Sequence, residues 1–177
     1  MLDDDEIQRL CQGRHGDPFS VLGPHRQEDG RTWVRALLPG ATAVAAVAGG
    51  ASVALHLRHA DGLFEGALPA DGPYRLQVTW PGTAPQLIDD PYRFGAVLGE
   101  MDAWLLAEGS HLRPYEMLGA MPRDMEGVAG TSFAVWAPNA ARVSVVGDFN
   151  LWDGRRHPMR LRRECGVWEL FLPGVRA

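Results

Sequence analysis

The sequence predicts a mainly β protein with two β-sandwich modules in tandem, and three observations lead to this fold class. Short apolar or alternating runs recur along the chain with turn residues between them, which is typical of antiparallel strands. The 177 residues include 21 Gly and 13 Pro, so many breaks and few long helices are expected. Two stretches also resemble one another, which indicates that one strand arrangement occurs twice.

A short helix is expected at the start of the chain. Ile7, Leu10 and Cys11 share one helical face, and the acidic residues 3–6 suit a helix N-terminus. The helix should end near Gly13, and the turn-rich stretch GDPFSVLGPH at 16–25 is interpreted as a connection. An immunoglobulin-like sandwich follows, with strands predicted at 33–38, 42–48, 52–57, 63–68 and 74–80.

A second helix is expected between the two modules. The apolar residues with helical spacing are Val97, Leu98, Met101, Trp104 and Leu105. Gly109 is expected to end this helix. We interpret the stripe as core packing.

The internal repeat appears at two alignment offsets. At 99 residues, TWVRALLPGATAVAAVAG falls on TSFAVWAPNAARVSVVGD, with Pro39 on Pro138. At 104 residues, GLFEGALPADG falls on GVWELFLPGVR, with Glu65 on Glu169. Apolar positions coincide in strand phase and turn residues coincide between them, so one plan is used twice. Chance agreement of two β-rich segments is the alternative.

The second copy is expected to be incomplete. In the first copy the strand at 74–80 follows Pro69, whereas the sequence ends soon after the equivalent Pro173. A sandwich without that strand leaves backbone groups unpaired. The predicted organisation is a helix and first module at 1–94, a connecting helix and linker at 95–125, and a second module at 126–177, incomplete at its C-terminus.

Composition narrows the classes of function. The net charge is −5, whereas nucleic-acid-binding domains usually carry a basic excess. The acidic start, MLDDDEIQRL, is unlike a secretion signal, and no apolar run reaches the length of a membrane span. Cys11 and Cys165 are expected as two reduced, partly buried thiols rather than a disulfide. We therefore expect a cytoplasmic protein without nucleic-acid or membrane partners.

Patterns for catalysis, cofactors or metals are weak. Asp89 and Asp90 are adjacent, but they point apart in an extended segment, and Asp-Pro commonly opens a turn. His56 and His59 fall on opposite faces of a predicted strand, which disfavours a metal site. The sequence has neither GxSxG nor a phosphate-binding loop. We expect no catalytic, cofactor-binding or metal-binding residue.

A basic run, RRHPMRLRR, follows the second predicted turn region. Its Arg160 and Arg162 alternate with apolar residues, in the phase of a half-exposed strand. A solvated strand face is the favoured interpretation, docking to an acidic surface of the same protein the second, and nucleic-acid binding a distant third. Glu65 and Glu169, which are equivalent in the repeat, are expected to have a surface or hairpin role in both copies.

Trp152 lies on the polar turn within VGDFNLWDGRRHPM. Such a tryptophan either covers the edge of the sandwich or offers a face on which a sugar ring stacks. Asn150, Asp153 and Arg155 would supply the polar ring of a glycan site around Trp152, and Phe149 is expected to point inward. The residues alone favour the glycan platform and the structural lid about equally.

The stretch FAVWAPNAARVSVVGDFNLWDGRRHPM, followed by GVWELFLPG, resembles the glycogen-binding β-sandwich module of α-glucan enzymes in the α-amylase superfamily. GDPFSVLGPH, LIDDPYRFG and DAWLLAEGSHLRPYEMLG are similar to the amino-terminal region of bacterial glycogen branching enzymes, the 1,4-α-glucan branching enzymes. Together these motifs extend the resemblance over essentially the whole chain.

The resemblance implies an enzyme that transfers α-1,4-glucan segments to form α-1,6 branches in glycogen biosynthesis. Its catalytic Asp and Glu belong to a (β/α)₈ barrel, so none has a counterpart in this chain, which is expected to be inactive alone. Trp152 matches the tryptophan that stacks on glucose in related modules. The implied partners are α-1,4-glucan or glycogen and the catalytic barrel of the same polypeptide; the alternative is a free-standing glycan-binding or protein-docking β-sandwich protein.

Overall fold

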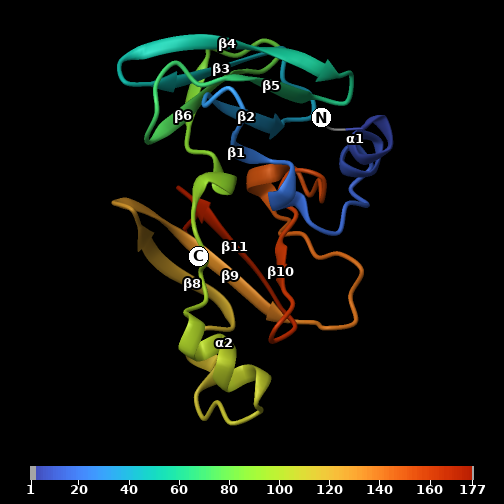
Figure 1. The fold of residues 1–177 in the computed structure, drawn as a ribbon, viewed down its shortest axis with the longest axis vertical. Coiled ribbons are helices and arrows are strands. Elements are labelled where there is room, and N and C mark those ends of the chain that lie inside the picture. The colour runs from blue at the N-terminus through green and yellow to red at the C-terminus, as the bar shows by residue number, and fades with distance from the viewer. Residues whose placement is uncertain (1–2, 177) are drawn as a thin grey trace. The chain divides into compact units, whose positions relative to one another are not determined.

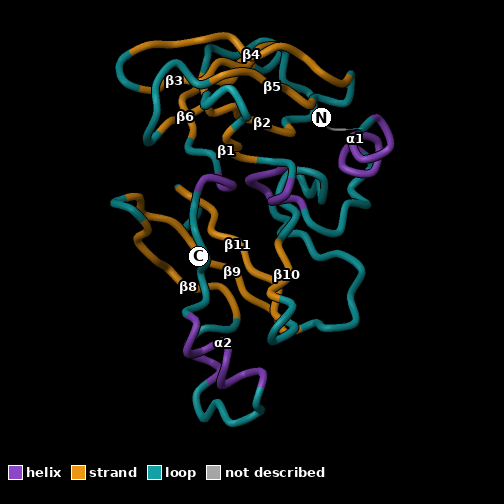
Figure 2. The backbone as a smooth tube through the Cα atoms, in the orientation of Figure 1, coloured by secondary structure: helices purple, strands orange, loops and turns teal. Residues whose placement is uncertain are grey.

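The computed structural model describes residues 3–176, which form two compact units. Unit 1 contains residues 3–14 and Phe19–Arg93, and unit 2 contains His15–Pro18 and residues 94–176. Figure 1 labels the helices and strands, and Figure 2 colours the backbone by secondary structure. Residues 1, 2 and 177 of the predicted modules lie outside the described residues.

The predicted first helix is confirmed as α1, Asp4–Cys11. The Asp3 carboxylate accepts a hydrogen bond from the Glu6 backbone N–H at 2.6 Å, which caps the helix start. Ile7, Leu10 and Cys11 are the buried residues of this helix. Their spacing therefore placed the apolar face correctly.

Unit 1 contains a seven-stranded antiparallel sheet in the order β1-β2-β5-β4-β3-β6-β7. Its strands are β1 Gly23–Arg26, β2 Thr32–Leu37, β3 Ala43–Ala48, β4 Ala51–His59, β5 Leu63–Ala67, β6 Tyr74–Thr79 and β7 Gln86–Ile88. The five predicted strands are confirmed as β2 to β6. The segment containing β1 was interpreted as a connection, and β7 was missed.

Strand β4 turns this sheet into a sandwich. Its first part pairs with β3, from Ala51 to Leu55, and its last part pairs with β5 from His56 onward, with a register shift before His59. The strand therefore passes from one layer to the other. The residues buried between the layers are Val34, Ala36, Val44, Ala46, Ala48, Leu55, Phe64, Tyr74, Leu76 and Val78.

Unit 2 contains a four-stranded antiparallel sheet in the order β10-β11-β9-β8. Its elements are helix α2 Glu100–Ala107 and strands β8 Gly119–Met125, β9 Val128–Trp136, β10 Arg160–Arg162 and β11 Val167–Pro173. Short 3₁₀ helices lie at Pro91–Arg93 (η2) in unit 1 and at Pro114–Glu116 (η3) and Asp148–Asn150 (η4) in unit 2. Strand β11 is central: residues 167–172 are all buried, on both faces of the strand.

Strand pairing confirms the internal repeat. Ala36 of β2 pairs with Phe64 of β5, and their equivalents at offsets of 99 and 104 residues, Val135 of β9 and Trp168 of β11, also pair. The turns agree as well. The Leu38 N–H donates to the Gly62 carbonyl at 2.8 Å, and the equivalent Ala137 N–H donates to the Gly166 carbonyl at 3.0 Å. The two offsets therefore describe one pair of strands built twice.

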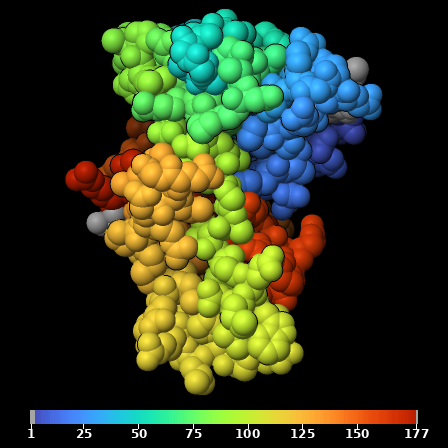
Figure 3. All heavy atoms as spheres, turned by 60° about the vertical axis from the view of Figure 1, so that its left-hand side comes forward, coloured from blue at the N-terminus to red at the C-terminus, as the bar shows by residue number. Residues whose placement is uncertain are grey.

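The prediction that the stripe around α2 packs in the core is wrong for its largest side chains. Met101 and Trp104 are exposed, and Ala103 is the buried residue of the helix. Apolar side chains lie on several sides of this eight-residue helix, so they cannot all face the core. Figure 3 shows the surface of α2 and the loop after it in yellow-green.

Among the described residues, no helix has the length and apolar character that a membrane crossing requires.

Candidate functional site

The turn that carries Trp152 is closed by backbone hydrogen bonds to Gly147. The Asn150 N–H and the Trp152 N–H both donate to the Gly147 carbonyl, at 3.1 and 3.0 Å. The Gly147 N–H in turn donates to the Asn150 side-chain oxygen at 3.0 Å. A Cβ at Gly147 would lie 2.5 Å from the Phe149 ring, so glycine leaves room for that ring.

Asn150 lies beneath this turn and not on its surface. Its side chain is buried, and the amide nitrogen lies 2.8 Å from both the Val145 carbonyl and His157 Nδ1. Burial, together with the Arg156 charge, lowers the pKa of His157 to about 4, so a neutral imidazole accepts this hydrogen bond near neutral pH. Asn150 therefore organises the turn from inside.

Trp152 faces solvent. Its side chain is 66% exposed, and its indole N–H donates to the Asp148 carboxylate at 2.9 Å, which restricts the orientation of the ring. Leu151 and Trp152 have φ values of 57° and 58°. The left-handed region costs a non-glycine residue roughly 1–2 kcal/mol, so the hydrogen-bonded turn holds the indole outward against local strain.

The prediction that Phe149 points inward is wrong. Its side chain is 46% exposed, and its ring centroid lies 5.8 Å from that of His157. The buried position of the 3₁₀ turn is taken by Asn150, whose amide has three polar partners there. A phenyl ring at that place would leave those partners without hydrogen bonds.

Asp153 and Arg155 form a bidentate ion pair next to Trp152 in the chain. Arg155 Nε lies 2.9 Å from Asp153 Oδ1, and Arg155 Nη2 lies 2.7 Å from Asp153 Oδ2. The Arg155 hydrogen bonds lower the pKa of the Asp153 carboxyl. Both side chains are partly exposed. Three of the four predicted site residues thus reach the surface of the turn, and Asn150 supports them from below.

A pocket that the sequence did not indicate lies elsewhere in unit 2. Its volume is about 440 Å³, and it is lined by Leu106, Ala107, Trp136, Pro138, Leu161, Arg163, Glu164, Cys165 and Gly166. Trp136, the last residue of β9, is 60% exposed. The repeat placed Trp136 on the buried Leu37, so the alignment indicated burial instead of an exposed ring.

Gly166 shapes this pocket. Its φ is +73°, and a Cβ there would lie 2.8 Å from Pro138 and 3.4 Å from the Trp136 indole nitrogen. Glycine avoids both the strain and the contact. The turn before β11 therefore packs closely against the loop that follows Trp136.

The expectation that the basic run forms a solvated strand face is wrong for Arg160 and Arg162. Their guanidinium groups lie 2.8 and 3.5 Å from the carboxylate of Glu169, which is 0% exposed rather than at the surface. The Leu98 N–H also donates to Glu169, at 2.6 Å. The two arginines further bind the carbonyls of Gly95 and Leu98. These charges hold the segment before α2 against the sheet.

The adjacent carboxylates of unit 1 have structural contacts. Asp90 is buried and accepts hydrogen bonds from the Tyr74 hydroxyl at 2.5 Å and the Tyr92 N–H at 2.9 Å. Burial raises the pKa of Asp90 to about 6 and also raises the pKa of Tyr74. Asp89 pairs with Arg93 at 3.1 Å. Cys11 and Cys165 are both buried and form no disulfide, which agrees with the prediction of two thiols.

Comparison with protein families identifies both parts of the chain. Residues 3–92, half of the chain, match the family described as alpha-1,4-glucan branching enzyme GlgB, N-terminal domain. Residues 117–177 match carbohydrate-binding module 48, the isoamylase N-terminal domain. The resemblance found in the sequence is thus confirmed. The chain belongs to the alpha-1,4-glucan branching enzyme family, as an amino-terminal domain followed by a carbohydrate-binding module.

Proposed function

We propose that unit 2 binds α-1,4-glucan by stacking a glucose ring on Trp152. The observation that carries the proposal is an indole 66% exposed on a polar turn, whose N–H group is already bound to Asp148. The C–H face of a glucose ring packs on such an indole, while its hydroxyls need polar partners. Asp153 and Arg155, which follow Trp152 in the chain and are partly exposed, would supply an acceptor and donors.

Asn150 acts in this proposal as a positioning residue. Its side chain contacts the Gly147 N–H and the Val145 carbonyl before the turn and the His157 ring after it, and it does not reach the surface. Replacing it by alanine removes the bonds that hold Leu151 and Trp152 in the left-handed region. We therefore expect Asn150→Ala to weaken glucan binding although every surface residue of the site remains.

The Trp136 pocket is a second candidate location for glucan on the same unit. It joins an exposed indole to Arg163 and Glu164, and its volume lies in the range of small-ligand pockets. One glucosyl unit would stack on the indole, and the charged side chains would bind its hydroxyls.

Electrophoresis of the chain in native gels containing glycogen tests both locations. A lost stacking contact of about 1.4 kcal/mol weakens binding about tenfold, so Trp152→Ala should migrate nearly as it does without glycogen. Trp136→Ala tests the pocket. Trp104→Ala on α2, which removes another exposed indole, is the matched control and should be retarded like the wild type.

Near-ultraviolet circular dichroism of each variant establishes that it is folded. Full retardation of folded Trp152→Ala would refute binding at that turn. If only Trp136→Ala loses retardation, glucan binds at the pocket instead. Full retardation of the double variant would exclude both locations.

We further propose that this binding region acts beside a catalytic barrel of the same polypeptide, in cytoplasmic glycogen synthesis. The branching-enzyme family match supports this, as do the exposed apolar side chains of Met101 and Trp104. In a polypeptide that extends into the barrel, Trp104 fluorescence should become less accessible to acrylamide than in residues 1–177. Equal quenching would argue against docking of α2 on the barrel.

A further inference from the structure

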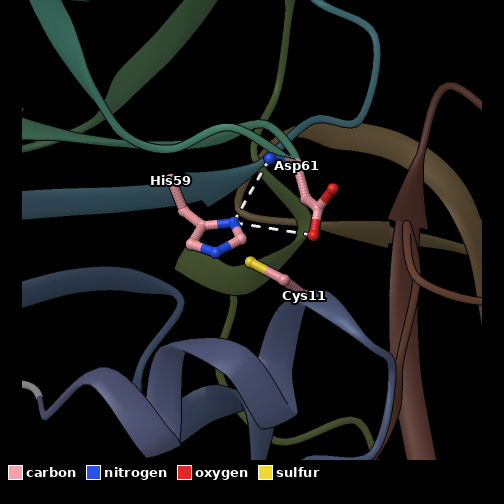
Figure 4. A group of neighbouring side chains, drawn as sticks. All are labelled: Cys11, His59 and Asp61. Atoms are coloured by element: carbon pink, nitrogen blue, oxygen red, sulfur yellow. Dashed lines mark hydrogen bonds and ion pairs between the residues drawn. The ribbon is translucent and has the colours of Figure 1, made fainter.

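A sulfur, a nitrogen and an oxygen donor come together in unit 1, whereas the residues proposed for glucan belong to unit 2. Cys11 is the last residue of α1, His59 the last residue of β4, and Asp61 belongs to the turn between β4 and β5. One ligand atom from each lies within 4.8 Å of the other two. Figure 4 shows the three side chains pointing toward one another.

The local fold accounts for this arrangement. The buried face of α1 directs Cys11 into unit 1. The Gly62 N–H donates to the His59 carbonyl at 3.0 Å, and Gly62 has a φ of +95°, which only glycine adopts readily. This tight turn brings Asp61 back to the His59 ring, and the Asp61 backbone N–H donates to His59 Nδ1 at 3.2 Å.

We propose that Cys11, His59 and Asp61 bind a zinc ion. His59 Nδ1 and Asp61 Oδ2 are 3.6 Å apart, and zinc–ligand bonds of about 2.0–2.2 Å place tetrahedral nitrogen and oxygen ligands about 3.4 Å apart. A mixed thiolate, imidazole and carboxylate set suits zinc better than magnesium or calcium. Asp61 is exposed, so the ion can reach the site and a water can complete the tetrahedron.

The histidine is in the form that a metal needs. Because Nδ1 accepts a hydrogen bond from the Asp61 N–H, this nitrogen carries a lone pair instead of a proton. Zinc would replace that hydrogen bond, and the Cys11 thiol would release its proton to solvent on binding. Sequence spacing related His59 only to His56 on the same strand, so it gave no indication of Cys11 or Asp61 as further ligands.

The bound ion would fasten α1 to the β4–β5 turn. Three protein ligands and one water would complete a four-coordinate site, and the protein ligands come from two segments that are distant in sequence. A ligand that binds the folded chain and not the unfolded chain stabilises the folded state. Zinc should therefore increase the thermal midpoint of unit 1.

Zinc titration of the metal-stripped, reduced chain, in competition with a chromophoric chelator, tests the site. We expect one zinc per chain, and the cobalt derivative should show a thiolate-to-metal charge-transfer band. Cys11→Ser, His59→Asn and Asp61→Asn should each weaken binding at least about tenfold. Cys165→Ser and His56→Asn are matched controls, which keep the site and should bind like the wild type.

Asp61→Asn changes an exposed turn residue and should remain folded even if Cys11→Ser, at a buried position, does not. The proposal is overturned if the folded wild type takes up no stoichiometric zinc, if the cobalt derivative lacks the thiolate band, or if Asp61→Asn binds with wild-type affinity. Glycogen retardation depends on unit 2 and should be the same with and without zinc, so failure of one proposal is distinguishable from failure of the other.

Discussion

The two units place equivalent glutamates in very different surroundings. Glu65 of β5 keeps 15% of its side chain exposed and pairs with Arg35 at 3.1 Å and with Arg58 at 3.6 Å. Glu169 of β11 is fully buried between Arg160 and Arg162. Equivalent positions in the two repeated strands thus have equivalent neighbouring positions on the adjacent strands, but their side chains need not be equally buried. Depth depends on what covers the strand, and in unit 2 the segment at Leu98 binds Glu169 directly.

The two units also differ in the segment that follows β2 in unit 1 and β9 in unit 2. In unit 1, β3 is hydrogen-bonded on both sides, to β4 and to β6. The equivalent residues 142–147 in unit 2 make one isolated bridge, Ser144 to Pro158, with two flanking backbone hydrogen bonds. Similar apolar spacing is therefore not enough for a strand, because a strand also needs partners along its edges.

The largest expected effect separates the two glutamates. Glu169→Gln leaves two arginine charges without a buried counter-charge, so the free energy of unfolding should fall by about 3–5 kcal/mol. Glu65→Gln acts on a partly exposed group and should cost about 1 kcal/mol or less. Urea unfolding followed by circular dichroism measures both. Similar losses for the two variants would contradict a difference in burial.

The second prediction uses pH, because Asp90 and His157 should act in opposite directions. Burial raises the folded-state pKa of Asp90 from 3.8 to about 6, so its contribution to stability is full below about pH 4 and is lost as pH rises through 6. This amounts to at most about 3 kcal/mol. The folded-state pKa of His157 is lowered from 6.5 to about 4, so its contribution is full above pH 6.5 and is lost as pH falls through 4.

Unfolding free energies measured between pH 4 and 7 distinguish the two groups. Asp90→Asn should remove the loss of stability on raising the pH, so that the His157 effect on acidification stands out. Glycogen retardation should weaken on acidification, since protonated His157 cannot accept the Asn150 hydrogen bond. A pH-independent difference between wild type and Asp90→Asn would contradict the assignment for Asp90.

The third prediction concerns equivalent glycines. Gly62 and Gly166 both have positive φ, and a Cβ would lie 2.9 Å from Pro39 in one unit and 2.8 Å from Pro138 in the other. Gly62→Ala and Gly166→Ala should therefore each destabilise their unit by about 2 kcal/mol. Thermal midpoints of the two variants test this. A large effect at only one glycine would show that the turns are less alike than their hydrogen bonds suggest.

The smallest effect is expected in amide exchange. The amides of β3 should be better protected than those of residues 142–147, by about tenfold, or roughly 1.4 kcal/mol of local opening energy. Exchange followed by NMR at neutral pH measures the difference. Equal protection would mean that the single bridge to Pro158 stabilises its segment as well as two full ladders do.

Much of the fold could be predicted because alternation and turn residues repeat. The strands β2 to β6, the equivalence of the repeated strand pair and the face of α1 all follow from local patterns. β1 and β7 could not be predicted in this way. Both are short strands at the edges of the sheet, where one-sided pairing imposes little hydrophobic pattern.

The candidate site was less accessible from sequence. The polar turn identified Trp152, but it did not distinguish the buried Asn150 from the exposed Phe149. Which of the two is buried depends on the Val145 carbonyl and the His157 ring, which bind the Asn150 amide beneath the turn. Trp136 was hidden by its apolar neighbours. Long-range contacts of this kind produce no residue spacing that can be recognised in a single sequence.

The course of β4 has a mechanical consequence for unit 1. A single nine-residue strand contributes hydrogen bonds to both faces of the sandwich, so neither face can peel away while the other stays intact. Force or denaturant must break the pairing of β4 with β3 and with β5 together, so unit 1 should unfold cooperatively in one step.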